Sequence, residues 1–189
     1  EGPRLTPLQE MGGLGSLRDE IDQNALAPVY ETIRLVKDAL PEDVTLIGFC
    51  GAPWSVATYM IAGRGTPDQA PARIYAYREP DNFAALIECL VRASAAYLVQ
   101  QLKAGVETVQ LFDTWAGVLA PEEFDRWCVQ PAKQIVALVR REVPNARIIG
   151  FPRGAGTNLL HYVETVPVNA VGLDWMIDRG FAREQIQSR

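Results

Sequence analysis

The sequence predicts an α/β fold organised around a parallel β-sheet. Four apolar runs of strand length are separated by longer segments whose apolar residues follow helical spacing. Strands that alternate with helices form parallel sheets, because each helix carries the chain back before the next strand begins. A length of 189 residues is enough for a sizeable core, so we expect a single domain over residues 1–189. The expected strands are residues 44–50, 108–113, 147–151 and 168–175.

Proline and glycine mark the ends of the expected helices. Residues 1–20 contain too many Gly and Pro residues for regular structure, and Pro41 stops the first helix. The longest amphipathic segment begins at Pro80 and is ended by Gly105. The expected helices are residues 22–40, 55–62, 67–77, 80–104, 121–142, 158–165 and 178–187.

Two architectures contain such a sheet: a doubly wound sheet and a (β/α)8 barrel. The variety of residues at the strand ends favours the barrel, because each loop at a barrel mouth adds one group to a shared site. No Gly-x-Gly-x-x-Gly follows the first strand, which disfavours a dinucleotide-binding sheet. A closed barrel needs eight strands and about 250 residues, so the sequence predicts a partial TIM barrel with about four of the eight strands present. The four strand ends are Phe49-Cys50, Asp113-Thr114, Pro152-Arg153 and Asp174-Trp175.

The composition is that of an ordinary globular protein, with 48% apolar and 22% charged residues and a net charge of −5. The negative charge disfavours nonspecific binding to nucleic acid, although a local cluster of arginines could still bind an anionic substrate. No signal peptide is visible, and no apolar run approaches the roughly 18 residues of a membrane span. We therefore expect a cytoplasmic protein with neither a nucleic-acid nor a membrane partner.

The cysteines and the histidine do not predict a metal site. Cys50, Cys89 and Cys128 lie far apart without a Cys-x-x-Cys pair, which is typical of reduced thiols in a cytosolic protein. His161 is the only histidine, and no ligand spacing surrounds it. We expect no metal, and we expect His161 to be a surface or interface residue.

Residues 46–60, LIGFCGAPWSVATYM, form the most informative segment. A buried strand here runs into a tight loop, and such loops carry functional groups in α/β enzymes. Tyr59 is either a hydroxyl that lines a site or a core tyrosine whose hydroxyl reaches the backbone. Thr114, in the segment LFDTWAGVL, either donates a hydrogen bond to a substrate carboxylate or caps the turn before Ala116.

These two segments and AVGLDW at residues 170–175 resemble the uroporphyrinogen decarboxylase family, and the similarity extends over nearly the whole chain. The resemblance implies a carboxy-lyase that removes carbon dioxide from the four acetate side chains of uroporphyrinogen III. The product is coproporphyrinogen III, an intermediate of haem and tetrapyrrole biosynthesis. The resemblance also implies that no cofactor is needed and that the enzyme is a homodimer.

The resemblance assigns roles to individual residues. Tyr59 corresponds to the catalytic, substrate-contacting tyrosine of the family, and Thr114 to a residue that contacts substrate. Phe49 corresponds to an aromatic wall of the tetrapyrrole pocket, with a simple core role as the alternative. The structural residues expected around them are the loop-orienting acceptors Asp113 and Asp174 and the loop anchors Trp54 and Trp115.

Other parts of the family pattern are absent. Arg153 stands where the family usually has Lys in a loop richer in glycine, so we assign it no role. The family's Arg-rich loop, its catalytic Asp and its Gly-His-Gly segment are not found, and His161 is not the family histidine. We therefore expect this chain to be the central part of the enzyme and to be inactive alone.

Two other functions remain open from the residues. One is a corrinoid- and zinc-dependent methyltransferase on the same barrel, for which Cys50 would be a strand-end ligand, although no His-x-Cys is present. The other is an inactive fragment with a binding or assembly role.

Overall fold

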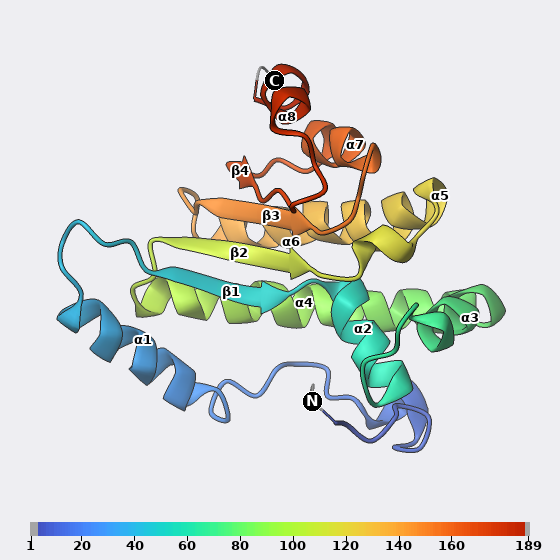
Figure 1. Ribbon diagram of the computed structural model, residues 1–189. Helices are drawn as coiled ribbons and strands as arrows, with labels where there is room; N and C mark the ends of the chain where they lie inside the picture. Colours follow the sequence, from blue (N-terminus) through green and yellow to red (C-terminus); the bar gives the residue numbers. More distant parts are fainter. Residues whose placement is uncertain (1–3, 188–189) are drawn as a thin grey trace.

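The computed structural model describes residues 4–187 and contains a four-stranded parallel sheet in the order β1-β2-β3-β4 (Figure 1). The strands are β1 (Ile47–Gly51), β2 (Thr108–Asp113), β3 (Ile148–Pro152) and β4 (Ala170–Val171). Gly51 pairs with Phe112, and Phe112 pairs with Phe151. The predicted parallel α/β fold is confirmed as a partial barrel, and residues 1–3 of the predicted N-terminal loop lie outside the described residues.

Prolines begin α2, α4 and α5, and glycines end α2 and α4. Pro80 starts α4, and Gly105 ends it at a positive φ of 121°. Pro53 starts α2, and Gly63 ends it in the left-handed conformation. The helices are α1 (Ala27–Ala39), α2 (Pro53–Ala62), α3 (Ala70–Arg78), α4 (Pro80–Ala104), α5 (Pro121–Phe124), α6 (Gln130–Glu142), α7 (Asn158–Thr165) and α8 (Arg179–Gln185), with 3-10 turns at Gly13–Ser16 and Ala116–Val118.

The predicted helix over residues 121–142 contains a π-helical turn, Asp125–Val129, between α5 and α6. Pro131 follows two residues after the end of this turn, as the second residue of α6. Proline lacks a backbone N–H and its ring collides with the carbonyl four residues earlier, so a regular α-helical turn is disfavoured here. The wider π turn accommodates the proline, and it places Cys128 in the core.

The last predicted strand, residues 168–175, is wrong in extent, because only Ala170 and Val171 pair with β3. Asn169 and Asp174 account for the short strand. The Asn169 side chain accepts a hydrogen bond from the backbone of Ile148, and Asp174 turns the chain by accepting from the backbone of Met176. The first strand also begins later than predicted, at Ile47 instead of residue 44.

One face of the sheet is covered by helices and the other is open. Helix α4 packs against β1 and β2, and α6 packs beside α4 (Figure 1). Val109 and Leu111 face this helical layer and are fully buried, whereas Phe49 and Phe112 point to the opposite face. In a barrel the second face of the sheet lies inside the closed structure.

Helix α4 is long and apolar enough to cross a membrane by length and composition alone, which the sequence analysis did not recognise. Within residues 4–187 it is the one helix that meets this criterion. Its apolar face lies in the protein core, with Phe83, Leu86 and Leu98 fully buried. Core helices of globular proteins also meet the criterion, so it carries no argument for a membrane.

Two loops touch through their backbones. Gly117, after β2, lies so close to Gly154, after β3, that a Cβ atom on Gly117 would stand 2.5 Å from the Gly154 carbonyl oxygen. The Gly117 N–H donates to the carbonyl of Arg153 over 3.1 Å. The loops that follow β2 and β3 are therefore held together.

We expect Gly117→Ala to destabilise the fold by about 1–3 kcal/mol, because the added methyl group must separate two backbone segments. Gly15→Ala is the control, since no atom lies within 4 Å of the corresponding position. Thermal and urea unfolding of the two variants would measure the difference. Equal stability would contradict the close loop contact.

Candidate active site

The site residues predicted from the sequence gather at the carboxyl ends of the strands. Strands β1, β2 and β3 point to one edge, where α2 leaves the sheet and the loop to α5 begins (Figure 1). A cavity of about 340 Å³ lies at this edge. Phe49 from β1, Tyr59 from α2 and Thr114 after β2 all line it. The complete lining is Phe49, Gly51, Ser55, Val56, Tyr59, Phe112, Thr114 and Trp115.

The Tyr59 and Thr114 hydroxyls are both free of hydrogen bonds to the described residues. Among the hydrogen bonds within residues 4–187, neither the Tyr59 hydroxyl nor the Thr114 hydroxyl has a partner. A core tyrosine bonded to the backbone and a turn-capping threonine were the alternative interpretations, and neither is observed. Each hydroxyl can therefore donate a hydrogen bond to a bound anion.

The direction of Tyr59 follows from Ser55, which lies four residues earlier on the same side of α2. Ser55 points to the end of β2, where its hydroxyl donates to the Asp113 carboxylate over 2.6 Å. The same hydroxyl accepts from the backbone N–H of Trp115 over 3.1 Å. Tyr59 thus lies on the side of α2 that borders the cavity, which Thr114 also lines.

Two further hydrogen bonds join α2 to this loop. The Ala52 N–H donates to the Phe112 carbonyl over 2.7 Å, and the Trp54 indole N–H donates to the Trp115 carbonyl over 3.0 Å. Trp54 is completely buried and is therefore a loop anchor, as predicted. Trp115 lines the cavity, and its indole nitrogen is buried without a hydrogen-bond partner among the described residues.

Asp113 is the structural acceptor that the sequence predicts. It points into the helical layer, is 4% exposed, and accepts from Ser55 and from the Cys128 thiol. Burial raises the pKa of the Asp113 carboxyl to about 6, although the hydrogen bonds from Ser55 and Cys128 oppose this shift. Burial, together with the nearby Asp113 carboxylate, raises the pKa values of Cys128 and Tyr162. The Asp113 carboxylate is consequently turned away from the cavity.

Aromatic rings form one wall of the cavity. Phe49 is 61% exposed on the uncovered face of the sheet, and its role as a wall of a substrate pocket stays a prediction. Its ring meets Phe112 edge to face at 5.8 Å, and Phe112 meets Phe151 in the same way at 5.7 Å. The sequence analysis missed Phe112, although strand alternation could have found it, because it lies between the inward-facing Leu111 and Asp113.

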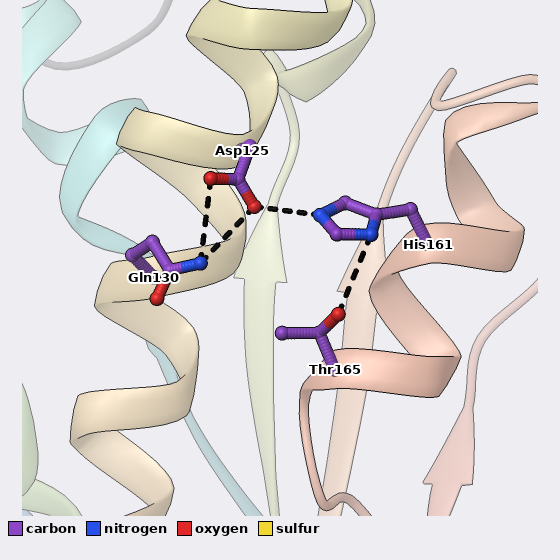
Figure 2. Close-up of polar contacts among 4 residues, drawn as sticks. All are labelled: Asp125, Gln130, His161 and Thr165. Carbon is purple, nitrogen blue, oxygen red and sulfur yellow. Dashed lines mark hydrogen bonds and ion pairs between the residues drawn. The ribbon is translucent and has the colours of Figure 1, made fainter.

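His161 lies outside this cavity, between two helical elements (Figure 2). Its Nε2 atom is 2.6 Å from Asp125 in the π turn, and its Nδ1 atom is 3.4 Å from the Thr165 hydroxyl. Gln130 donates to both oxygens of Asp125. The sequence predicts that His161 is a surface or interface residue, and its exposure confirms the surface position. It joins α7 to the helix that follows β2.

The described residues give little support to a thiolate metal site. Within residues 4–187, no three His, Cys, Asp or Glu side chains are grouped to hold a metal ion. Cys50, the strand-end residue considered as a zinc ligand, is buried against the helices, and burial raises the pKa of its thiol to about 12. A thiol in that state is a poor metal ligand.

A parallel sheet whose carboxyl-edge loops build an apolar cavity with two free hydroxyls is typical of a (β/α)-barrel enzyme. The family model for uroporphyrinogen decarboxylase (URO-D) matches residues 1–189. Uroporphyrinogen decarboxylase from Brucella anthropi is 52% identical over 182 residues, which is 96% of this chain and 53% of that protein. The Brucella canis and Brucella suis enzymes match to the same extent, at 52% identity over 182 residues.

The chain therefore belongs to the uroporphyrinogen decarboxylase family, as the sequence resemblance predicts. It spans about half the length of the curated relatives it matches, with 53% of each covered.

We expect Asp113→Asn to remove a pH dependence of stability. The pKa of Asp113 is raised from 3.8 to about 6, so the folded chain holds a proton between these values that the unfolded chain has released. The free energy of unfolding of the wild type must therefore fall as pH rises through this window, by about 3 kcal/mol at most. Asparagine keeps an acceptor for Ser55 and carries no charge.

The measurement is urea unfolding of both proteins between pH 4 and pH 8, taking the difference in free energy at each pH. The variant should gain stability relative to the wild type as pH rises, and the gain should level off above the Asp113 pKa of about 6. Parallel pH profiles would show that Asp113 does not titrate in this window.

Proposed function

We propose that this chain takes part in the decarboxylation of uroporphyrinogen III, a carboxy-lyase reaction that needs no cofactor. The acetate side chains become methyl groups, and coproporphyrinogen III is the product. One observation carries the proposal: the free hydroxyls of Tyr59 and Thr114 face one cavity beside the exposed Phe49 ring. The names of the Brucella relatives support the same reaction.

The reaction uses the pyrrole ring as an electron sink. A ring carbon accepts a proton, the electrons of the bond to the carboxylate move into the ring, and carbon dioxide leaves. A proton then takes its place on the remaining carbon, and the ring returns the proton it accepted. Groups that are fixed in place before the positive charge develops on the ring lower the barrier most.

The cavity residues divide this work by their chemistry. The Phe49 and Phe112 rings form an apolar wall for the face or edge of a pyrrole. Tyr59 and Thr114 donate hydrogen bonds to an acidic side chain of the substrate, and Tyr59 can alternatively hold a partner carboxylate. Ser55 keeps the two donors in register through its contacts with Asp113 and Trp115.

This cavity does not supply the carboxylate that would stabilise a protonated ring. The carboxylate nearest in sequence to Thr114 is Asp113, which is buried on the helical side of the sheet and bonded to Ser55. The chain spans 53% of the length of its Brucella relatives. In this proposal the remaining length supplies the carboxylate and the arginines, and the chain alone does not turn over substrate.

The cellular setting follows from the same proposal. We place the enzyme in the cytoplasm as a homodimer, with the tetrapyrrole as its ligand and with neither nucleic acid nor membrane as a partner. The net charge of −5 accords with the absence of nonspecific nucleic-acid binding.

We expect Tyr59→Phe and Thr114→Val each to lower kcat/KM for uroporphyrinogen III by about 10- to 100-fold in the whole enzyme. Each change removes one hydrogen bond to a charged group and little volume. Tyr77→Phe is the control, because Tyr77 is an exposed residue of α3. Product porphyrins, oxidised and separated by chromatography, give the rates. Unchanged kinetics in both site variants would contradict the proposed roles.

We further expect the 189-residue chain alone to show no decarboxylation. The same assay would compare it, at equal concentration, with a protein that extends over the full length of the Brucella relatives. Addition of separately produced flanking segments should restore activity if they complete the site. Turnover by the purified 189-residue chain would overturn this part of the proposal.

A further inference from the structure

We propose that Arg153, braced by Trp175, binds a carboxylate of the tetrapyrrole that is retained in the product. The inference rests on the proposed decarboxylation and adds a subsite to it. Arg153 follows β3 at the carboxyl edge of the sheet, and the Trp175 ring follows β4 at the same edge. The Arg153 guanidinium lies over that ring, 4.9 Å from its centroid.

The backbone of Arg153 is fixed next to the cavity. Its N–H donates to the Asp113 carbonyl over 3.1 Å, and its own carbonyl accepts from the Gly117 N–H over 3.1 Å. Thr114, which lines the cavity, directly follows Asp113 in the chain. The backbone of Arg153 is therefore bonded to Asp113 and Gly117, which lie on either side of Thr114 in the chain.

Arg153 has a stacking partner but no counter-ion. Within residues 4–187 no carboxylate forms an ion pair with it. The adjacent carboxylate, Asp174, uses both oxygens for backbone N–H groups, with Gly154 at 2.7 Å and Met176 at 2.9 Å. Asp174 thus stabilises the loops after β3 and β4, and the charge of Arg153 remains available to a ligand.

The conformation of the loop around Arg153 is fixed before a ligand binds. Gly154 holds a positive φ of 73° and packs against Gly117, which fixes the direction of the chain immediately after Arg153. Trp175 is 79% exposed and borders a hollow of about 740 Å³ formed by residues 173–179. A guanidinium held on an aromatic face presents its edge to a carboxylate, which it can bind through two N–H groups.

The chemistry of decarboxylation selects which carboxylate Arg153 binds. An ion pair with the reacting acetate would stabilise the ground state and oppose the loss of carbon dioxide. An ion pair with a propionate side chain carries no such penalty, because propionates keep their charge throughout the reaction. Arg153 therefore contributes equally to the binding of substrate and of product. Its loss should raise KM and leave kcat nearly unchanged.

The test uses the whole enzyme with Arg153→Gln, Arg153→Lys, Trp175→Leu and Trp175→Phe. We expect Arg153→Gln to raise KM for uroporphyrinogen III about tenfold with kcat nearly unchanged, which is the effect of losing one charged hydrogen-bonded pair. The inhibition constant of added coproporphyrinogen III should rise by the same factor. Arg153→Lys and Trp175→Leu should give smaller increases, and Trp175→Phe should resemble the wild type.

Arg126→Gln is the matched control. Arg126 also stacks on a tryptophan, with its guanidinium 4.4 Å from the centroid of Trp127, but it lies in the π turn of the helical layer. Its loss should leave both constants unchanged. Melting temperatures of all variants separate effects on binding from effects on folding.

Three results would overturn the inference while leaving the proposed function intact. Arg153→Gln could leave KM unchanged; a lower melting temperature of the same variant would then place its counter-ion elsewhere in the whole protein. KM could also rise without a change in the product inhibition constant, which would assign Arg153 to the reacting acetate. Equal increases of KM in Arg126→Gln would show a general charge effect.

A direct binding assay separates this inference from the proposed function. Uroporphyrin III, the oxidised and fluorescent form of the substrate, can be titrated into wild-type and Arg153→Gln proteins. A wild-type protein that binds it through Arg153 but never turns over the substrate would keep the subsite and overturn the decarboxylase proposal.

Discussion

The hydrogen bond from Ser55 to Asp113 is the contact on which the candidate site depends. It crosses from the first turn of α2 to the end of β2, two segments that lie 58 residues apart in the chain. The bond is buried, so losing either partner would leave the other with one hydrogen bond fewer and no water to replace it: the Ser55 hydroxyl would keep the Trp115 N–H, and Asp113 would keep the Cys128 thiol. The Ser55 contact orients the side of α2 that carries Tyr59, and the Asp113 contact fixes the position of the neighbouring Thr114. A short, buried polar contact thus places two residues that have no hydrogen bond to each other.

Much of the fold could be predicted from local sequence, because helix ends and parallel strands depend on local chemistry. Pro80 and Gly105 delimit α4 as expected, since proline begins helices and glycine adopts positive φ. The extent of β4 could not be predicted from hydrophobicity. Its length is set by the side chains of Asn169 and Asp174, which satisfy backbone groups that a longer strand would have used.

The candidate site was predictable in its members but not in its geometry. Phe49, Tyr59 and Thr114 could be chosen from the segments around them, and the structure brings all three to one cavity. Two features depend on how α2 packs against β2. The Tyr59 and Thr114 hydroxyls lack partners among the described residues, and the Asp113 side chain points to the helical layer. Such long-range packing leaves no periodic signal in the sequence, and neither does the stacking of Arg153 on Trp175.

The backbone contact between Gly117 and Gly154 couples the loop after β2 to the loop after β3, so that the two move together. Neither loop can open alone, because movement of one carries the other through a contact with no flexible side chain in between. The conformational entropy of both loops is therefore lost when the chain folds and not when a ligand arrives. A site built in this way gains affinity from rigidity, and it discriminates among ligands by shape more than by adjusting to them.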